Sequence, residues 1–107
     1  MFCVIYRFVV KPGQETRFVD AWSEVTRAFI ESCGALGSRL HVVAGQEYIA
    51  YAQWPSRETR ESAELPQAVQ DGPWTTMRGC CNSIETVYEL TPVADHLIPA
   101  SIDDKSS

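Results

Sequence analysis

The stretch EYIAYAQW, Glu47–Trp54, determines how the rest of the chain is arranged. It is a run of strand-forming and small residues, and it ends at Pro55 and Ser56, where a helix can begin. Neither of its faces is uniformly polar, so it is predicted to form a central strand that is covered on both sides. Side chains alternate along a strand, which places Tyr48, Ala50, Ala52 and Trp54 on one face and Ile49, Tyr51 and Gln53 on the other.

The first of these faces has space on it, because Ala50 and Ala52 stand next to Trp54. Either a helix packs into that space, or a flat ligand occupies it and stacks on the indole ring. Large aromatic side chains are commonly packing residues, so both interpretations of Trp54 stay open. Tyr48 lies on the same face and is a further candidate for ligand contact.

The longest predicted helix spans residues 14–33. Its apolar side chains recur at helical spacing, and Gly34 follows where a left-handed C-cap is expected. Trp22 belongs to this stripe, so it either packs in the core or lines a pocket. The stripe consists of Phe18, Trp22, Val25 and Phe29.

Three more strands and a fragmented second helical region complete the pattern. The strands are predicted at Phe2–Val10, 38–44 and Cys81–Leu90, and the helical pieces at 56–64, 66–71 and 73–79. Gly72 and Pro73 are expected to break the helix before the last piece. Trp74 follows this break and either lies on a mobile lid or closes one end of the core.

The order β-α-β-β-α-β predicts an α+β, ferredoxin-like domain, with a four-stranded antiparallel sheet and helices on one face. We expect this domain to occupy residues 1–91 and a tail to follow at 92–107. The first and third strands are apolar on both sides, so the second face of the sheet needs a cover. A second copy of the chain would provide it, sheet against sheet, in a homodimer.

The turn at Gly45 and Gln46 joins the second and third strands into a predicted hairpin. A two-residue turn puts His41 opposite Ala50 and Arg39 opposite Ala52. In this register Arg39 and His41 share the face of Tyr48, Ala50, Ala52 and Trp54, whereas a slip of one residue would send both to the other face.

Arg39 and His41 are the candidate catalytic residues on this hairpin. His41 can act as a general base towards a phenolic or enolic hydroxyl, because imidazole changes charge near neutral pH. Arg39 can stabilise the oxyanion that results. The alternative is a structural or interface role for both side chains.

Composition excludes several classes of function. The chain has 107 residues, 45% hydrophobic and 21% charged, with a net charge of -5, which disfavours binding to nucleic acid or to an anionic membrane. No apolar run is long enough to span a bilayer, and no secretory signal peptide is expected at the N-terminus. The four cysteines lack metal-site spacing and are expected to be free thiols in the cytoplasm. No motif for a phosphate, a nucleotide, a flavin or a metal occurs, so no cofactor is expected.

Two segments resemble the antibiotic biosynthesis monooxygenase (ABM) family. They are GSRLH at 37–41 and YIAYAQWPSRE at 48–58, preceded by a strand, Lys-Pro-Gly at 11–13 and a helix. The resemblance extends from about Phe2 to Leu90, and it implies a small dimeric α+β barrel. Members include cofactor-free monooxygenases of hydroxylated aromatics or quinols and haem-degrading enzymes.

The family's functional residues are only partly present. Anthrone-oxidising members have a tryptophan at the place of Trp54 and an asparagine four residues earlier, where this chain has Ala50. Haem-degrading members use an asparagine on the first strand and a histidine on the later helix, and this chain has neither, so haem degradation is not expected.

The resemblance leads to three hypotheses. The first is a cofactor-independent monooxygenase, an oxidoreductase acting on a small aromatic, a quinol or a polyketide-like molecule. His41 would be the base, Arg39 the oxyanion stabiliser and Trp54 the stacking wall, with Trp22 and Trp74 as further ligand contacts. The second is a non-catalytic dimeric module that binds a small apolar ligand. The third is a cyclase or isomerase on the same scaffold.

Overall fold

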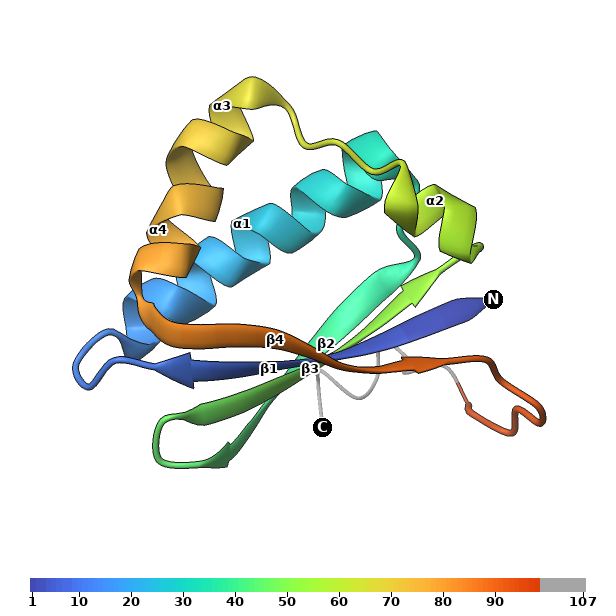
Figure 1. Ribbon diagram of the computed structural model, residues 1–107, viewed down its shortest axis with the longest axis horizontal. Coiled ribbons are helices and arrows are strands. Elements are labelled where there is room, and N and C mark those ends of the chain that lie inside the picture. Colours follow the sequence, from blue (N-terminus) through green and yellow to red (C-terminus); the bar gives the residue numbers. More distant parts are fainter. Residues whose placement is uncertain (99–107) are drawn as a thin grey trace.

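The computed structural model describes residues 1–98, and these form one antiparallel sheet with helices against one face (Figure 1). The order of elements matches the predicted β-α-β-β-α-β pattern. Residues 99–107, the larger part of the predicted tail, lie outside the described residues. The elements are β1 (Phe2–Val10), α1 (Glu15–Cys33), β2 (Gly37–Ala44), β3 (Glu47–Trp54), α2 (Arg57–Glu61), α3 (Gln67–Val69), η1 (Gln70–Trp74), α4 (Thr75–Gly79) and β4 (Cys81–Leu90).

The sheet has the strand order β2-β3-β1-β4, so β3 and β1 are its central strands. These are the two strands whose sequences are apolar on both sides, as expected for central strands, because both faces of a central strand are covered. All helices lie over one face, and the opposite face carries no helix of the described chain (Figure 1). We call this second surface the open face.

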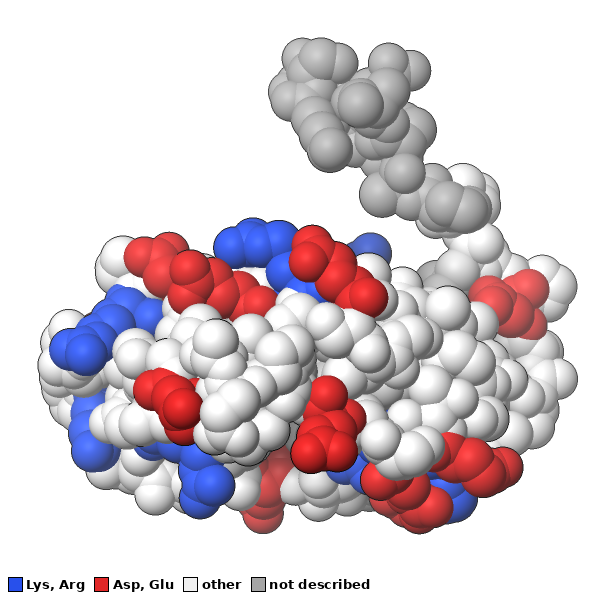
Figure 2. Space-filling view, turned by 90° about the horizontal axis from the view of Figure 1, so that it is seen from above, with Lys and Arg blue, Asp and Glu red and all other residues white. Residues whose placement is uncertain are grey.

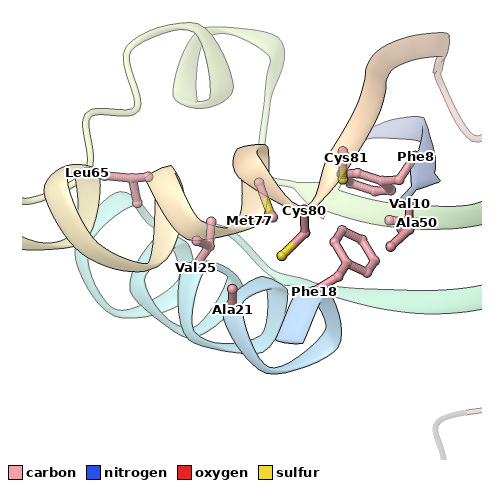
Figure 3. Close-up of a cluster of buried hydrophobic side chains, with 10 residues drawn as sticks. All are labelled: Phe8, Val10, Phe18, Ala21, Val25, Ala50, Leu65, Met77, Cys80 and Cys81. Atoms are coloured by element: carbon pink, nitrogen blue, oxygen red, sulfur yellow. The ribbon is translucent and has the colours of Figure 1, made fainter. Parts of the chain in front are cut away.

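The main core lies between the sheet and α1 and contains ten buried side chains (Figure 3). The Phe18 ring of α1 packs against the strands, 5.0 Å from the ring of Phe8. Phe18, Ala21 and Val25 are the buried residues of α1, which confirms the helical stripe. Gly34 forms the predicted left-handed C-cap of this helix, with φ at 77°. Its N–H donates to the carbonyl of Phe29.

The prediction that Gly72 and Pro73 break the second helical region is wrong. The chain passes from α3 through the π-helical turn η1 into α4, with Pro73 inside the turn. Proline has no N–H to donate, and a wider π turn lets the chain continue past it. The Thr75 hydroxyl donates to the carbonyl of Gln70 at 2.7 Å across this turn.

The predicted register of the β2–β3 hairpin is also wrong. Ala44 pairs with Glu47 as expected, but a β-bulge at Val43 shifts the remaining pairs by one residue. His41 therefore lies opposite Ile49, and Arg39 lies opposite Tyr51. Both side chains belong to the open face, because directly opposed residues of antiparallel strands share a face.

A second register shift occurs where β4 pairs with β1. Thr86 pairs with Tyr6, whereas Tyr88 pairs with Ile5. The side chains of Ile84 and Thr86 consequently face the helices, and those of Tyr88 and Leu90 belong to the open face. The regular alternation of side chains along Cys81–Leu90 in the sequence gives no sign of this shift in register.

The open face carries an ion-pair cluster at its centre. Arg7 Nε donates to Glu47 at 2.6 Å, and Arg7 Nη1 donates to Glu85 at 3.1 Å. These hydrogen bonds, with that to Glu47 the stronger, raise the pKa of Arg7 above its ordinary value. A cation on a strand therefore has two carboxylate partners from the neighbouring strands.

Three observations concern the surface and the cysteines of the described residues. No helix is long and apolar enough to cross a membrane. Acidic and basic side chains are interspersed on the face seen in Figure 2. All four cysteines are free thiols, and burial raises the pKa of Cys81 to about 11.

Candidate functional site

A cavity of about 390 Å³ lies between the sheet and the helices. This volume is within the range of small-molecule sites in proteins. Most of its lining is apolar, with polar groups at a few positions. Its lining includes Tyr6, Trp22, Ala52, Trp54, Arg60, Trp74 and Glu85.

All three tryptophans of the chain line this cavity. The Trp54 ring lies 5.6 Å from the Phe29 ring at 74°, and the Phe29 ring lies 6.4 Å from the Trp74 ring at 88°. Such edge-to-face contacts hold large rings in fixed orientations. The cavity therefore has rigid aromatic walls suited to a flat, apolar ligand.

The polar wall of the cavity is formed by Arg60 and Tyr6. Arg60 Nε donates to the Tyr6 hydroxyl oxygen at 3.0 Å. Its guanidinium carbon is also 5.6 Å from the centre of the Tyr6 ring. Both residues line the cavity, so a cation and a hydroxyl group meet there.

Glu89 of β4 pairs with two arginines of α2, Arg57 and Arg60. Its carboxylate accepts from Arg57 at 2.8 Å and from Arg60 at 3.4 Å. The hydrogen bond from Arg57, more than the charges of the two arginines, lowers the pKa of Glu89 below its ordinary value. Arg57 lies over the Phe2 ring, 4.5 Å from its centre, and does not line the cavity.

One buried donor of the site has no partner. The side chain of Trp54 is 4% exposed, and its Nε1 atom makes no hydrogen bond within the described part of the chain. Buried polar groups are almost always satisfied in folded proteins. Neighbouring side chains enclose this N–H, so it is not open to a ligand in the cavity.

The cavity offers few groups for acid–base or metal chemistry. Glu85 is the only carboxylate in its described lining, and that lining includes no histidine. Glu85 is already bonded to Arg7. Among residues 1–98, no group of three His, Cys, Asp or Glu side chains is arranged to hold a metal ion.

The family model described as antibiotic biosynthesis monooxygenase matches residues 1–70, which is more than half of the chain. The chain belongs to the antibiotic biosynthesis monooxygenase family. No curated protein sequence matches it significantly.

Solved structures of this family share the fold. SnoaB, a cofactor-independent oxygenase from Streptomyces nogalater, is 18% identical, with a TM-score of 0.72 over 89% of this chain and 95% of that chain. A proposed antibiotic biosynthesis monooxygenase from Bordetella bronchiseptica is 19% identical, with a TM-score of 0.72 over 87% and 97% of the two chains. A similar protein from Chloroflexus aurantiacus is 19% identical, with a TM-score of 0.71 over 92% and 98%. At such identities the likeness shows the fold, and activity has to be argued from the site.

In this member of the family, the residues proposed from sequence as ligand contacts divide into two groups. Trp22, Ala52, Trp54 and Trp74 line the cavity. Tyr48 and Ala50 lie on the same face of β3 as Ala52 and Trp54, but they do not line the cavity. Tyr48 packs on Phe18 with ring centres 5.3 Å apart, and Ala50 is buried in the main core.

The two proposed catalytic residues of this family member lie away from the cavity. Arg39 and His41 are exposed on the open face because of the Val43 bulge. His41 Nδ1 lies 3.3 Å from the carbonyl oxygen of Ile49, which fits a tautomer that donates to it. The predicted grouping of Arg39 and His41 with Trp54 is therefore wrong, and their catalytic roles stay predictions.

Sequence reasoning missed Tyr6 and Arg60. Arg60 belongs to a charged helix that follows Trp54, and its side chain contacts Tyr6 and Glu89. One signal was available: at a period of two, Tyr6 shares the face of Val4 and Phe8. A tyrosine hydroxyl on a buried face needs a hydrogen-bond partner.

Proposed function

We propose that the protein is a cofactor-independent monooxygenase that oxidises a small aromatic, quinol or polyketide-like substrate in the cavity between sheet and helices. The observation that carries this proposal is the cavity itself, about 390 Å³ in volume and lined by three tryptophans, with Arg60 and Tyr6 as polar lining residues. Membership of the antibiotic biosynthesis monooxygenase family supports it. The shared fold of SnoaB, described as a cofactor-independent oxygenase, is consistent with it.

The proposed reaction needs no external reductant. A substrate with a methylene group between two aromatic rings that conjugate it to a carbonyl, such as an anthrone, loses a proton and becomes an electron-rich anion. Its carbon transfers electrons to O₂ and forms a C–O bond, giving a hydroperoxide after protonation. Loss of the remaining C–H proton then breaks the O–O bond and releases water. The methylene becomes a carbonyl, so the four electrons lost by the substrate are those that reduce O₂.

The side chains of the cavity would serve this reaction by binding and desolvation. Rigid indole walls orient a flat ring system, and Ala52 leaves room for it next to Trp54. An apolar surrounding excludes water from the reactive anion and its peroxide. His41 and Arg39, the base and oxyanion stabiliser proposed from sequence, lie on the open face and do not line this cavity, so these roles would require a substrate bound at the open face.

A non-catalytic binding module is the second candidate. The observation that favours it is the lack of an imidazole in the described cavity lining, with the single carboxylate of Glu85 held by Arg7. A cavity that only binds a ligand needs no proton acceptor. A cyclase or isomerase would need one, and it stays the third hypothesis.

We also propose that the protein functions as a homodimer through its open face. This face combines apolar side chains with the Arg7 cluster, and Tyr88 on it is 62% exposed and Leu90 40%. A contiguous apolar sheet surface is typically covered in solution. A second copy placed sheet to sheet would cover it with the same residues.

Oxygen uptake by the metal-stripped protein with 1,8-dihydroxyanthrone tests the activity. We expect protein-dependent uptake, with one atom of ¹⁸O from ¹⁸O₂ in the product carbonyl. Ala52→Leu, which narrows the cavity, should reduce the rate, whereas Arg17→Ala on the outer surface is the matched control. His41→Ala tests the assignment of the base: a lower kcat supports it, and an unchanged kcat removes His41 from the mechanism.

Uptake equal to that of buffer would contradict the monooxygenase proposal. If the same compound still quenched tryptophan fluorescence, the binding module would be favoured, because all three tryptophans line the cavity.

A further inference from the structure

We propose that Arg60 and Tyr6 bind an anionic oxygen of the ligand at the polar wall of the cavity, and that Glu89 positions Arg60 for this. The inference rests on the proposed function only in using the same cavity, and it does not depend on oxygen chemistry. It moves the oxyanion-binding role from Arg39, which lies on the open face, to a cation that lines the cavity.

The Tyr6 hydroxyl accepts one hydrogen bond and has its own proton free to donate. Its oxygen accepts a hydrogen bond from Arg60 Nε at 3.0 Å. A phenol has one proton to donate, and within residues 1–98 that proton has no acceptor. Because Tyr6 lines the cavity, a ligand oxygen there is an acceptor within its reach.

The polar wall of the cavity is cationic. Arg60 is the only cationic side chain in the described cavity lining. Glu89 cannot neutralise it fully, because the same carboxylate is bonded more closely to Arg57, at 2.8 Å against 3.4 Å. Glu85, the only carboxylate of the lining, is bonded to Arg7. The polar wall therefore favours an acceptor that carries negative charge.

The aromatic walls define the rest of the ligand class. Trp22, Trp54 and Trp74 line the cavity, and their rings suit a flat ligand. The ligand class is therefore a planar aromatic with an ionised oxygen at its edge, such as a carboxylate, a phenolate or an enolate.

Glu89 acts on the ligand only through Arg60. It holds the Nη1 atom of Arg60, which leaves Nε directed at Tyr6. A long arginine side chain has many rotamers, so an anchor on β4 reduces the entropy lost when the ligand binds. Glu89 is thus a positioning residue, and its loss should reduce the preference for anions without removing the cavity.

The test compares two probes of nearly equal shape by isothermal titration calorimetry, 2-naphthoate and the uncharged 2-naphthamide. We expect the unaltered protein to prefer naphthoate, and Arg60→Met to weaken naphthoate binding by about tenfold or more with little change for naphthamide. Arg57→Met is the matched control, because Arg57 lies on the same helix and bonds the same carboxylate but does not line the cavity. It should lower the ratio of the two affinities much less than Arg60→Met does, because it frees Glu89 to pair more closely with Arg60 but leaves the cation in the cavity lining.

Two further variants test the parts of the proposal. Tyr6→Phe keeps the ring and should reduce naphthoate affinity by several-fold, and Glu89→Gln should lower the naphthoate-to-naphthamide ratio while naphthamide still binds. Circular dichroism checks that each variant is folded. If Arg60→Met does not fold, Tyr6→Phe decides the proposal alone.

Three outcomes would overturn the inference. These are equal losses in Arg60→Met and Arg57→Met, equal losses for the two probes, and failure of the unaltered protein to bind 2-naphthoate. Anion-selective binding without oxygen uptake would instead reject the monooxygenase proposal and leave this one standing. If the protein consumed oxygen but showed no preference for the anion, and Arg60→Met and Tyr6→Phe did not change the uptake, the monooxygenase proposal would stand and this inference would be rejected.

Discussion

Ala50 and Ala52 lie two positions apart on the same face of β3, but their surroundings differ. Ala50 is 1% exposed and belongs to the main core, next to side chains from α1. Ala52 is 8% exposed and lines the cavity. The space that the sequence indicated next to Trp54 is therefore present beside one alanine and filled beside the other.

A pair of leucine variants tests this difference. Ala50→Leu should lower the free energy of unfolding by about 1–3 kcal/mol, because extra methylene groups in a packed core force side chains from their rotamers. Ala52→Leu should cost less, because its side chain can extend into the cavity, and it should weaken the binding of 2-naphthoate. Urea unfolding and calorimetry measure the two effects. Equal losses of stability would mean that Ala52 has no space next to it.

At the scale of elements, the Val43 bulge decides which residues of β2 face the core. It turns Leu40 towards the helices, where it packs against the main core, and leaves His41 and Arg39 on the open face. A regular hairpin with the same turn would have done the opposite.

Alanine variants of two adjacent residues check this register. Leu40→Ala should lower the free energy of unfolding by about 2 kcal/mol, because it removes a partly buried side chain from the core. His41→Ala should change it by less than about 0.5 kcal/mol, because the ring is exposed. Urea unfolding measures both in the same buffer. A larger loss for His41→Ala would restore the register expected from the sequence.

The contact between α2 and β4 depends on the ionisation of Glu89. Its pKa is lowered chiefly by the hydrogen bond from Arg57, so ionised Glu89 favours the folded state. This stabilisation is fully present above the ordinary pKa of 4.5 and is lost as pH falls through the lower pKa of the folded protein. We expect Glu89→Gln to unfold at a lower temperature than the unaltered protein at pH 7, and the two Tm values to converge as pH falls below 4.5. A Tm difference independent of pH would show that the carboxylate charge is not responsible.

At the scale of the whole molecule, the open face predicts association. A stable interface buries roughly 800 Å² on each partner, and one face of this sheet is the surface without helices. Tyr88→Arg should raise the dissociation constant of the proposed homodimer by at least about tenfold, because it places a cation in an apolar contact. Val19→Arg, an exposed apolar position on α1, is the control that should not change it. Sedimentation velocity measures both, and a monomeric unaltered protein at micromolar concentration would contradict the homodimer.

The sequence by itself determined the elements and most of their limits. Runs of strand-forming residues, bounded by turn signals, gave the limits of β1, β3 and β4 to the residue. Periodicity of 3.6 gave the buried side of α1, because this pattern arises from local backbone geometry. The family followed from short segments around Trp54, and the three tryptophans proposed as ligand contacts do line one cavity.

Only the tertiary structure decided which of these residues meet. The bulge at Val43, the shift in β4 and the passage of the helix through Pro73 depend on pairing with distant strands and on packing, which no local pattern specifies. The same holds for Arg60, whose partners Tyr6 and Glu89 lie far from it in sequence. Sequence periodicity gives the face of a residue within its own element, whereas a site is formed by faces of different elements, and their register is set by the folded chain as a whole.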